Sequence, residues 1–119
     1  ESTDYFAIED ELVVEALRYI SRHLAERVSL EQITRAVAIS PRSLQLRFDA
    51  ALGRPISAEI RRLRLEKAKR MLADKTWQIS EVARQSGFLT ATQMGQVFQR
   101  ELHMAPSAYR KQVLGERVE

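Results

Sequence analysis

The chain has 119 residues, with 19 Lys and Arg against 16 Asp and Glu, no cysteine, and 45% hydrophobic but only 7% aromatic residues. This length supports one compact domain of about 100–150 residues or two very small ones, which argues against a large catalytic α/β domain. The lack of cysteine excludes disulfides, thiolate nucleophiles and cysteine-based zinc sites, and no apolar run approaches the ~18–20 residues of a membrane span. We therefore expect a cytoplasmic protein with no membrane partner, and because the sequence begins with Glu1 we expect a piece of a longer protein.

The net charge of +3 conceals a gradient along the chain. Residues 1–28 carry seven acids and three bases, a net charge of −4, whereas the remainder carries +7. Within residues 42–75 there are ten bases and four acids, an asymmetry that suggests an anionic partner. A solvated helix face would give the same count, so the charge alone does not identify nucleic acid as the partner.

Helix formers dominate the sequence, and only four Gly and three Pro interrupt it, so the predicted fold class is all-α. Ser29 and Gln32 fit the capping box, in which each side chain bonds the backbone N–H of the other residue. Thr90 and Gln93 fit the same pattern. Ser40 is a cap followed by proline at the first helical position. The predicted helices span residues 10–25, 29–37, 41–52, 56–73, 79–86, 91–102 and 106–113.

An internal repeat organises these helices into two copies of one unit. The residues that recur 49 positions later are Leu30, Ile33, Thr34, Ala38 and Ile39, matched by Ile79, Val82, Ala83, Gly87 and Phe88. After a one-residue insertion, the residues that recur at an offset of 50 are Ser40, Leu44, Phe48, Leu52, Ser57 and Ala58, matched by Thr90, Met94, Phe98, Leu102, Ser107 and Ala108.

Each copy has the pattern of a helix-turn-helix: a short helix, a tight turn, a capping hydroxyl and a second helix with apolar residues at i, i+4 and i+8. A tandem helical hairpin that merely packs is the alternative, but solenoid repeats usually need three or more units to bury a continuous core. The pattern favours a DNA-binding helix-turn-helix.

The outer faces of the two second helices supply the candidate DNA contacts. With Leu44, Phe48 and Leu52 facing the core, helical geometry turns the opposite side chains outward. Arg pairs with guanine, Gln pairs with adenine, and Thr or Leu packs on the thymine methyl group. The candidate base-reading residues are Arg42, Gln45, Leu46, Thr92, Gln93 and Gln96, and the candidate phosphate-contacting residues are Ser40, Arg47, Thr90, Gln99 and Arg100.

Two further residues of these faces differ in what they offer to DNA. Asp49 is expected to face outward, yet its carboxylate repels phosphate unless it accepts from a cytosine amine or pairs with a neighbouring Arg, so it ranks below the others. Gly95 supplies no side-chain contact but allows a close approach of the backbone.

Residues 57–74 contain neither Gly nor Pro, and their apolar stripe predicts one helix between the two copies. Eighteen residues at about 1.5 Å each make a rod of roughly 27 Å, close to the ~34 Å between successive major-groove faces. We expect a minority of its bases to contact phosphate, because an i,i+4 pair such as Glu66 with Arg70 needs no DNA. The stripe comprises Ile60, Leu63, Leu65, Ala68, Met71 and Leu72, and the bases are Arg61, Arg62, Arg64, Lys67, Lys69 and Arg70.

Residues 29–113 resemble the AraC/XylS family of transcription regulators. The resemblance rests on the segments ISPRSLQLRFDAALGR (39–54), IRRLRLEKAKRML (60–72), ISEVARQSGF (79–88) and FQRELHMAPSAYR (98–110). It implies a seven-helix DNA-binding domain of two helix-turn-helix subdomains joined by one long helix, with the third and sixth helices in adjacent major-groove segments of double-stranded DNA. The base-reading positions that it implies coincide with the six residues derived above from helical facing.

Residues 2–20 resemble the segment that follows a sugar-sensing domain in the xylose-operon regulator subgroup, although Tyr5, Phe6 and Ile8 would equally serve as a hydrophobic strap on the first helix. The subgroup resemblance implies a sugar-responsive regulator of a xylose-like utilisation operon. We expect this regulator to act as an activator. The sugar effector and dimerisation are then expected in a missing N-terminal domain, with RNA polymerase as a further candidate partner. The expected divisions are a linker at 1–9, a DNA-binding domain at 10–113 with parts 10–55, 56–74 and 75–113, and a tail at 114–119.

Three residues depart from the family pattern. Ala38 stands where the turn often carries Gly, and a positive φ there would cost on the order of 1 kcal/mol. Glu59 replaces an aromatic residue that corresponds to Tyr109 of the second copy. Ala105 precedes Pro106 where a capping hydroxyl is usual. The second reading helix also lacks Arg and Lys at its base-facing positions, so that half is expected to bind less tightly or to position the protein through backbone contacts.

Other residues carry little chemistry. His23 and His103 are expected at the surface or at helix ends because neither has a partner at metal-ligand spacing, and Trp77 is expected to anchor the second copy as a hydrophobic staple. We expect no metal, no cofactor and no enzyme activity. The competing function is a helical protein-interaction module that uses the acidic first helix and does not bind DNA.

Overall fold

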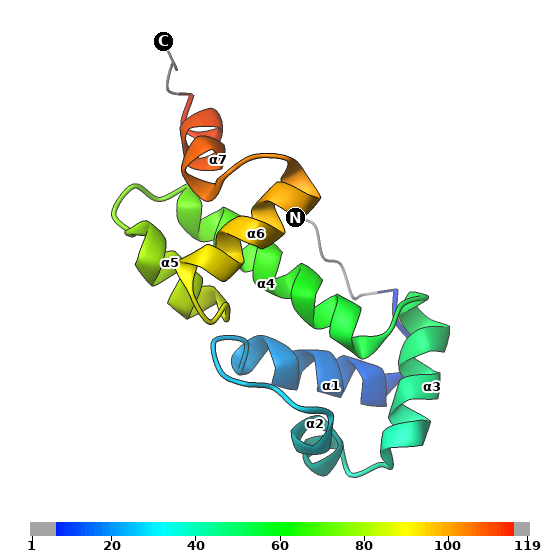
Figure 1. Cartoon of the computed structure of the whole chain (residues 1–119). Helices are drawn as coiled ribbons and strands as arrows, with labels where there is room; N and C mark the ends of the chain where they lie inside the picture. Colours follow the sequence, from blue (N-terminus) through cyan, green and yellow to red (C-terminus); the bar gives the residue numbers. More distant parts are fainter. Residues whose placement is uncertain (1–6, 116–119) are drawn as a thin grey trace. The chain divides into compact units, whose positions relative to one another are not determined.

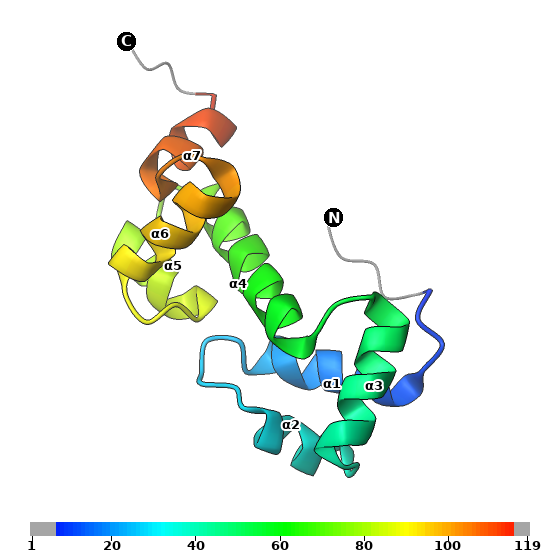
Figure 2. The same ribbon diagram turned by 45° about the vertical axis from the view of Figure 1, so that its right-hand side comes forward.

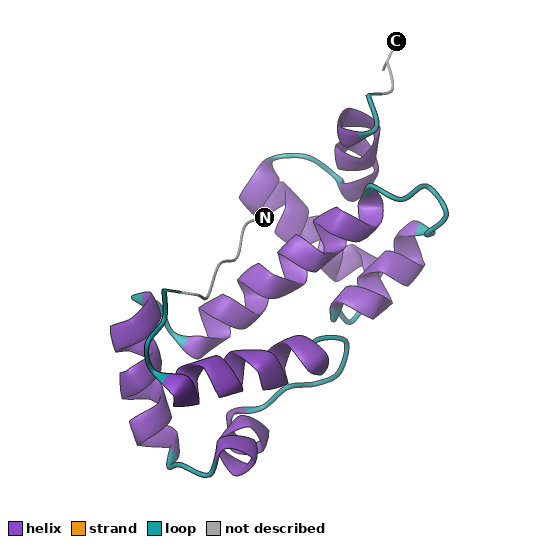
Figure 3. Ribbon diagram, turned by 180° about the vertical axis from the view of Figure 1, so that it is seen from behind, coloured by secondary structure: helices purple, strands orange, loops and turns teal. Residues whose placement is uncertain are grey.

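The computed structural model describes residues 7–115. Most of the expected linker at 1–9, with Tyr5 and Phe6, and most of the expected tail at 114–119 lie outside the described residues. The described part contains seven α-helices and no strand, which confirms the predicted all-α class (Figure 1; Figure 3). The helices are α1 (Glu11–Arg22), α2 (Leu30–Val37), α3 (Pro41–Leu52), α4 (Ile56–Leu72), α5 (Ile79–Ser86), α6 (Ala91–Leu102) and α7 (Pro106–Val113).

The helix boundaries agree with the predicted ones to within one residue, except at the end of the first helix. α1 ends at Arg22, three residues before the predicted end, because His23 leaves helical geometry with φ −113° and ψ 22°. The carbonyl of His23 then accepts from the N–H of Glu26 at 2.9 Å, which closes a turn instead of continuing the helix. His103 occupies the corresponding place after α6, so both histidines lie at helix ends, as predicted.

The chain divides into two compact units, with the boundary inside α4 between Leu63 and Arg64. In the first unit, α1, α2, α3 and the first part of α4 surround one apolar core. Figure 2 shows α5, α6 and α7 gathered around the C-terminal end of α4 in the second. The first core comprises Val13, Ala16, Leu17, Ile20, Leu24, Ile33, Val37, Leu44, Phe48, Ile56, Ile60 and Leu63, and the second comprises Leu65, Ala68, Leu72, Val82, Ala83, Phe88, Met94 and Phe98.

The repeat is visible in the burial of its members. Leu44 and Met94 are fully buried at matching positions of α3 and α6, and Phe48 and Phe98 are fully buried one turn later. The first helix of each copy likewise buries Ile33 or Val82. The apolar i, i+4 spacing therefore predicted the inner face of both second helices correctly.

The capping box predicted at Ser29 is present. Ser29 Oγ accepts from the N–H of Gln32 at 3.2 Å, and Gln32 Oε1 accepts from the N–H of Ser29 at 2.9 Å. Ser40 caps α3 by accepting from the N–H of Ser43 at 3.2 Å, with Pro41 at the first helical position. These bonds satisfy backbone donors that a helix start leaves without partners.

The capping box predicted at Thr90 is only half correct. Thr90 Oγ1 accepts from the N–H of Gln93 at 3.0 Å, but Gln93 Oε1 accepts from the N–H of Leu89 at 2.8 Å instead of that of Thr90. Leu89 is the one-residue insertion between the two halves of the repeat. The extra residue brings its own N–H into reach of the Gln93 side chain, so the return bond moves back by one position.

All four helices of the two helix-turn-helix units end at a C-cap residue with left-handed backbone, and these residues match across the repeat. α2 and α5 end at Ala38, φ 59°, and Gly87, φ 101°, whereas α3 and α6 end at Gly53, φ 72°, and His103, φ 61°. All four are thus left-handed, and each copy has one glycine and one side-chain-bearing residue there. The positive φ anticipated at Ala38 is confirmed, and Ala38 and His103 carry the cost that glycine avoids.

Glu59 forms a buried ion cluster at the start of α4, which was not foreseen from the sequence. Its side chain is fully buried, and its two carboxylate oxygens accept from Arg54 and from both Nε and Nη2 of Arg62. A buried carboxylate requires such pairing because an isolated buried charge is unstable. Further along α4, Glu66 pairs with Lys69 at 3.4 Å, so the ion pair that we predicted between Glu66 and Arg70 is replaced by an i,i+3 pair.

Arg110 of α7 fastens the end of α4 in the second unit. Its Nε donates to the carbonyl of Leu72 at 2.9 Å, and its Nη2 donates to the carbonyls of Asp74 at 3.1 Å and Trp77 at 2.5 Å. One guanidinium thereby satisfies carbonyls at a helix end that lack helical partners. Trp77 packs against the second core just before α5, in agreement with the predicted staple. Ala105 provides no side-chain cap for α7, as expected.

Candidate nucleic-acid interface

The outer face of α3 presents all the side chains that were predicted for it. Leu44 and Phe48 face the core, and Arg42 and Leu46 are exposed on the other side. Leu46 is 60% exposed, whereas the apolar side chains of Leu44 and Phe48 in the same helix are fully buried. The hydroxyl of Ser40 accepts a bond from the N–H of Ser43 and keeps its own hydrogen available for donation.

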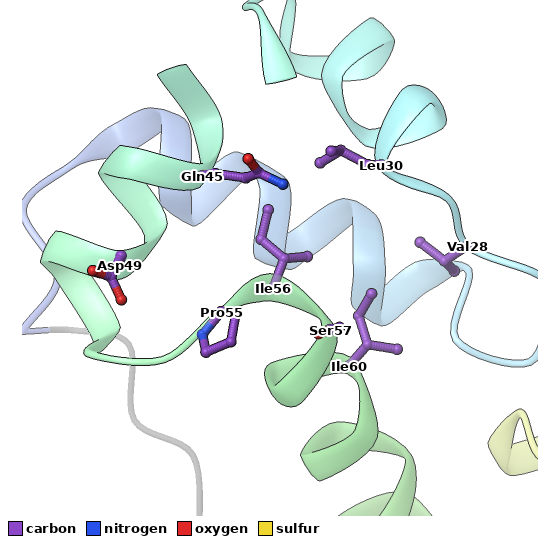
Figure 4. Close-up of a pocket in the computed structure, with 8 residues that line it drawn as sticks. All are labelled: Val28, Leu30, Gln45, Asp49, Pro55, Ile56, Ser57 and Ile60. Carbon is purple, nitrogen blue, oxygen red and sulfur yellow. The ribbon is translucent and has the colours of Figure 1, made fainter. Parts of the chain in front are cut away.

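Gln45 and Asp49 are exposed but also line a pocket beside α3 (Figure 4). In Figure 4 the Gln45 side chain extends from α3 toward Leu30 and Ile56. The Gln45 side chain is thus exposed to solvent and borders the pocket at the same time.

Arg47 is exposed on α3 but already holds an acidic partner. Its Nη1 lies 3.0 Å from Oδ1 and 2.9 Å from Oδ2 of Asp10. Asp10 is also the N-cap of α1, where its Oδ1 accepts from the N–H of Leu12 at 3.0 Å. A phosphate contact by Arg47 therefore has to compete with this carboxylate. Because Asp10 and Arg47 are 37 positions apart, helix periodicity could not predict the pair.

The outer face of α6 is polar and uncharged at its base-facing positions. Thr92, Gln93 and Gln96 are exposed, as predicted, while Met94 and Phe98 are buried. Gln93 already uses Oε1 to accept from Leu89, so a two-bond contact with adenine requires that this bond be given up. Thr90, like Ser40, accepts a capping bond and keeps its hydroxyl hydrogen.

Three further positions complete the α6 face. Gln99 and Arg100 are exposed, and Arg100 Nε lies 3.4 Å from Oε2 of the exposed neighbour Glu101, a weak surface ion pair. A Cβ added at Gly95 would meet nothing within 4 Å, so the fold itself does not require glycine there. Leu89, in the turn before α6, is 75% exposed.

The bases of α4 differ in their surroundings. Arg61 and Arg70 are exposed, whereas Arg62 is bound to Glu59 and Lys69 to Glu66. Burial lowers the pKa of Arg64 from its ordinary value. Arg62 and Lys69 thus already hold acidic partners within α4, while the expectation that only a minority of the bases contacts phosphate stays a prediction.

The described residues hold no group of three or more His, Asp or Glu side chains arranged to bind a metal ion. None of the helices in residues 7–115 is both long and apolar enough to cross a membrane.

Comparison with known proteins identifies the family. Residues 33–112 match the helix-turn-helix domain family. The chain is 33% identical over 109 residues to the xylose operon regulatory protein of Escherichia coli K12, covering 92% of this chain and 28% of that protein. It is 32% identical over 104 residues to the regulatory protein PocR of Salmonella typhimurium, covering 87% of this chain and 34% of that protein. The chain thus spans about a third or less of the length of these relatives.

Solved structures agree with this match. The structure of the xylose-binding transcription activator xylR superposes with a TM-score of 0.83 at 33% identity, covering 92% of this chain and 29% of that one. The DNA-binding domain of AdpA, solved in complex with a target DNA, superposes with a TM-score of 0.77 at 26% identity, covering 84% of this chain and 90% of that one.

These relatives are transcription regulators and not enzymes, in line with the expectation for this chain, and they do not support the alternative of an interaction module that leaves DNA unbound. The matched region begins within α2 and includes the second helices of both helix-turn-helix units, α3 and α6. The chain belongs to the AraC-type helix-turn-helix family, the DNA-binding domains of transcription regulators.

Proposed function

We propose that this domain recognises a specific double-stranded DNA site for a regulator of a xylose-like sugar-utilisation operon. The observation that carries the proposal is the repeated unit, in which a capped second helix buries one face and exposes residues suited to base edges on the other. The similarity to xylose operon regulatory proteins supports the sugar operon over other targets.

Base recognition is assigned to the exposed residues of α3 and α6. Arg42 would pair with the O6 and N7 atoms of guanine, and Leu46 would pack on a thymine methyl group. Gln96 would pair with adenine. Gln45 and Gln93 would do so after leaving their present positions beside the pocket and on the Leu89 N–H, and Thr92 would add a contact to a thymine methyl group.

Phosphate contacts are assigned to residues around the start of each reading helix and along its exposed side. The hydroxyls of Ser40 and Thr90 would donate to phosphate oxygens, and Arg47 would do so once it separates from Asp10. Gln99 and Arg100 would donate hydrogen bonds to phosphates of the DNA strand that lies along α6. Such contacts position a protein on DNA and make its affinity depend on salt.

The remainder of the regulator would supply the sugar effector site and dimerisation through an N-terminal domain, and RNA polymerase would be contacted at the promoter in the cytoplasm. These assignments rest on the similarity to the xylose regulators, of which the chain covers less than a third. Purified full-length regulator should bind its DNA site more tightly with xylose than with a non-metabolised sugar, and equal affinity would contradict the sugar assignment.

The DNA assignment is tested by selecting binding sites from random double-stranded DNA at low salt. A consensus site should emerge, and Arg42→Ala should cost about 1–3 kcal/mol at one guanine position while other positions stay unchanged. Arg18→Ala, an exposed arginine of α1 outside the proposed interface, is the control and should leave the consensus intact. Failure to select any site would contradict sequence-specific binding, and an unchanged consensus for the Arg42 variant would contradict only its assigned role.

A further inference from the structure

The first unit contains a pocket of about 420 Å³ between α3, the loop before α2 and the start of α4 (Figure 4). This volume lies within the range of about 300–1,000 Å³ that is usual for small-molecule sites. All of its lining residues belong to the first unit, and none of the contacts described above fills it.

The lining is divided by polarity. Val28, Leu30, Ile56 and Ile60 make an apolar wall, whereas α3 contributes the side chains of Gln45 and Asp49. In Figure 4, Asp49 lies beside α3 at the end of the pocket away from Val28 and Ile60. The pocket thus offers an apolar surface at one end and a carboxylate at the other.

The second unit explains why this space is open in the first. The repeat matches Val28 with Trp77 and Ile60 with Arg110, and both second-unit residues are much larger. Trp77 packs on the second core, and its carbonyl accepts from Arg110 at 2.5 Å. Replacing this bonded Trp and Arg pair by Val and Ile removes side-chain volume from the corresponding place in the first unit.

Asp49 is the only acidic residue of α3, and it is not among the candidate base-reading residues. Its carboxylate makes no ion pair or hydrogen bond with the other described residues. The nearby cation Arg47 is bound to Asp10 and not to Asp49. A carboxylate that has no cation of its own, at the end of an apolar pocket, is suited to a ligand that brings both an apolar body and a positive charge.

We propose that this pocket binds a small amphipathic organic cation. Its apolar body would pack on Val28, Leu30, Ile56 and Ile60, and its ammonium group would lie at the Asp49 carboxylate, with the Gln45 amide oxygen as a second acceptor. Binding by itself does not depend on the proposed function. An effect of the ligand on DNA binding does rest on the proposed function. Because Gln45 is also assigned to base reading, a ligand in the pocket would hold this side chain away from DNA.

The test compares three probes of one shape on the 119-residue chain without DNA: 2-phenylethylammonium, neutral 2-phenylethanol and anionic 3-phenylpropionate. Their titration is followed by NMR of methyl groups and side-chain amides. The cation is expected to shift the signals of Leu30, Ile56, Ile60 and the Gln45 amide and to bind about fivefold more tightly than the alcohol, with the anion weakest.

Two variants separate the charge from the cavity. Asp49→Asn should abolish the preference for the cation while leaving binding of the alcohol unchanged, whereas Glu15→Gln, which removes an exposed charge from α1, should preserve the preference. Val28→Trp introduces the residue of the second unit and should block all three probes in a chain that keeps its native spectrum. Equal affinity for the three probes, shifts confined to other residues, or a cation preference retained by Asp49→Asn would each overturn the proposal.

Discussion

Two features of single residues stand out in this fold: left-handed backbone at residues other than glycine, and a carboxylate that serves two partners. Ala38 and His103 adopt left-handed backbone at helix ends, where glycine occupies the matching position of the other copy. Asp10 serves both as the N-cap of α1 and as the ion-pair partner of Arg47 on α3. The first feature predicts a change in stability, and the second predicts a change in DNA affinity, when the residue is replaced.

Replacing Ala38 by glycine should stabilise the first unit by about 1 kcal/mol, because a left-handed conformation costs a residue with a Cβ about 1–2 kcal/mol and glycine returns part of this as chain entropy. Chemical denaturation measures the change. Gly53→Ala is the converse control: its added Cβ would meet nothing within 4 Å, so its expected loss of about 1 kcal/mol reports strain alone. A glycine variant of unchanged or lower stability would contradict the assigned strain.

Asp10→Asn should increase DNA affinity severalfold, because Arg47 then meets phosphate without competition from a carboxylate. Asparagine caps a helix as well as aspartate does, so α1 should stay intact. Fluorescence anisotropy with the selected site gives the affinity. Glu9→Gln removes the adjacent exposed charge without touching Arg47 and is the matched control. If both variants gain equally, general repulsion and not the Asp10–Arg47 pair explains the effect.

At the scale of elements, the helix starts of the two copies are not equally well capped. α2 begins with the reciprocal bonds of Ser29 and Gln32. The N-cap residue of α5 is Gln78, whose backbone is extended but whose side chain makes no capping bond. In the second copy, Arg110 instead links α7 to the segment between α4 and α5 by donating to three carbonyls around the end of α4.

Gln78→Ser should therefore stabilise the second unit by about 0.5–1 kcal/mol, because a serine hydroxyl can accept from the N–H of Glu81 in the same way as Ser29 does from Gln32. Thermal unfolding and amide hydrogen exchange in α5 measure the gain. The reverse change in the first copy, Ser29→Gln, should lose a similar amount. No increase in protection of α5 would show that water already satisfies these donors equally well.

For the whole molecule, the distribution of charge matters more than the net value of +3. Asp10, from the acidic segment 1–28, pairs with Arg47 of α3, and Glu59 and Glu66 pair with Arg62 and Lys69 of α4. Part of the basic excess is thus paired with acidic residues of the same chain, and the part available to DNA is smaller than the sequence count suggests.

The salt dependence of DNA binding should report that smaller number. Changing Arg47 and Arg100 together to Ala should reduce the slope of log affinity against log salt by about two phosphate contacts, at about 0.9 for each contact. The same double change at Arg18 and Arg22 of α1, which are exposed and outside the proposed interface, should leave the slope unaltered. If the slope falls equally in both double variants, the cause is the overall charge of the domain and not phosphate contacts by Arg47 and Arg100.

The sequence by itself determined the all-α class, the duplicated helix-turn-helix and the inner and outer faces of α3 and α6. These follow from local rules: apolar residues at i and i+4 share a face, and a hydroxyl beside a helix start accepts a backbone N–H. The exposure of all eleven candidate contact residues follows from the same rules, while their roles on DNA stay predictions.

Only the tertiary structure decided which polar groups bind one another across the chain. The partners Asp10 with Arg47, and Arg110 with the Leu72 carbonyl, are 37 and 38 positions apart, beyond any helical period. The apolar pocket that joins Gln45 and Asp49 to Val28 also depends on long-range packing. Helix periodicity sets the direction in which a side chain leaves its own helix, but its neighbour is set by how the helices pack, and that packing decides which predicted contacts are already occupied.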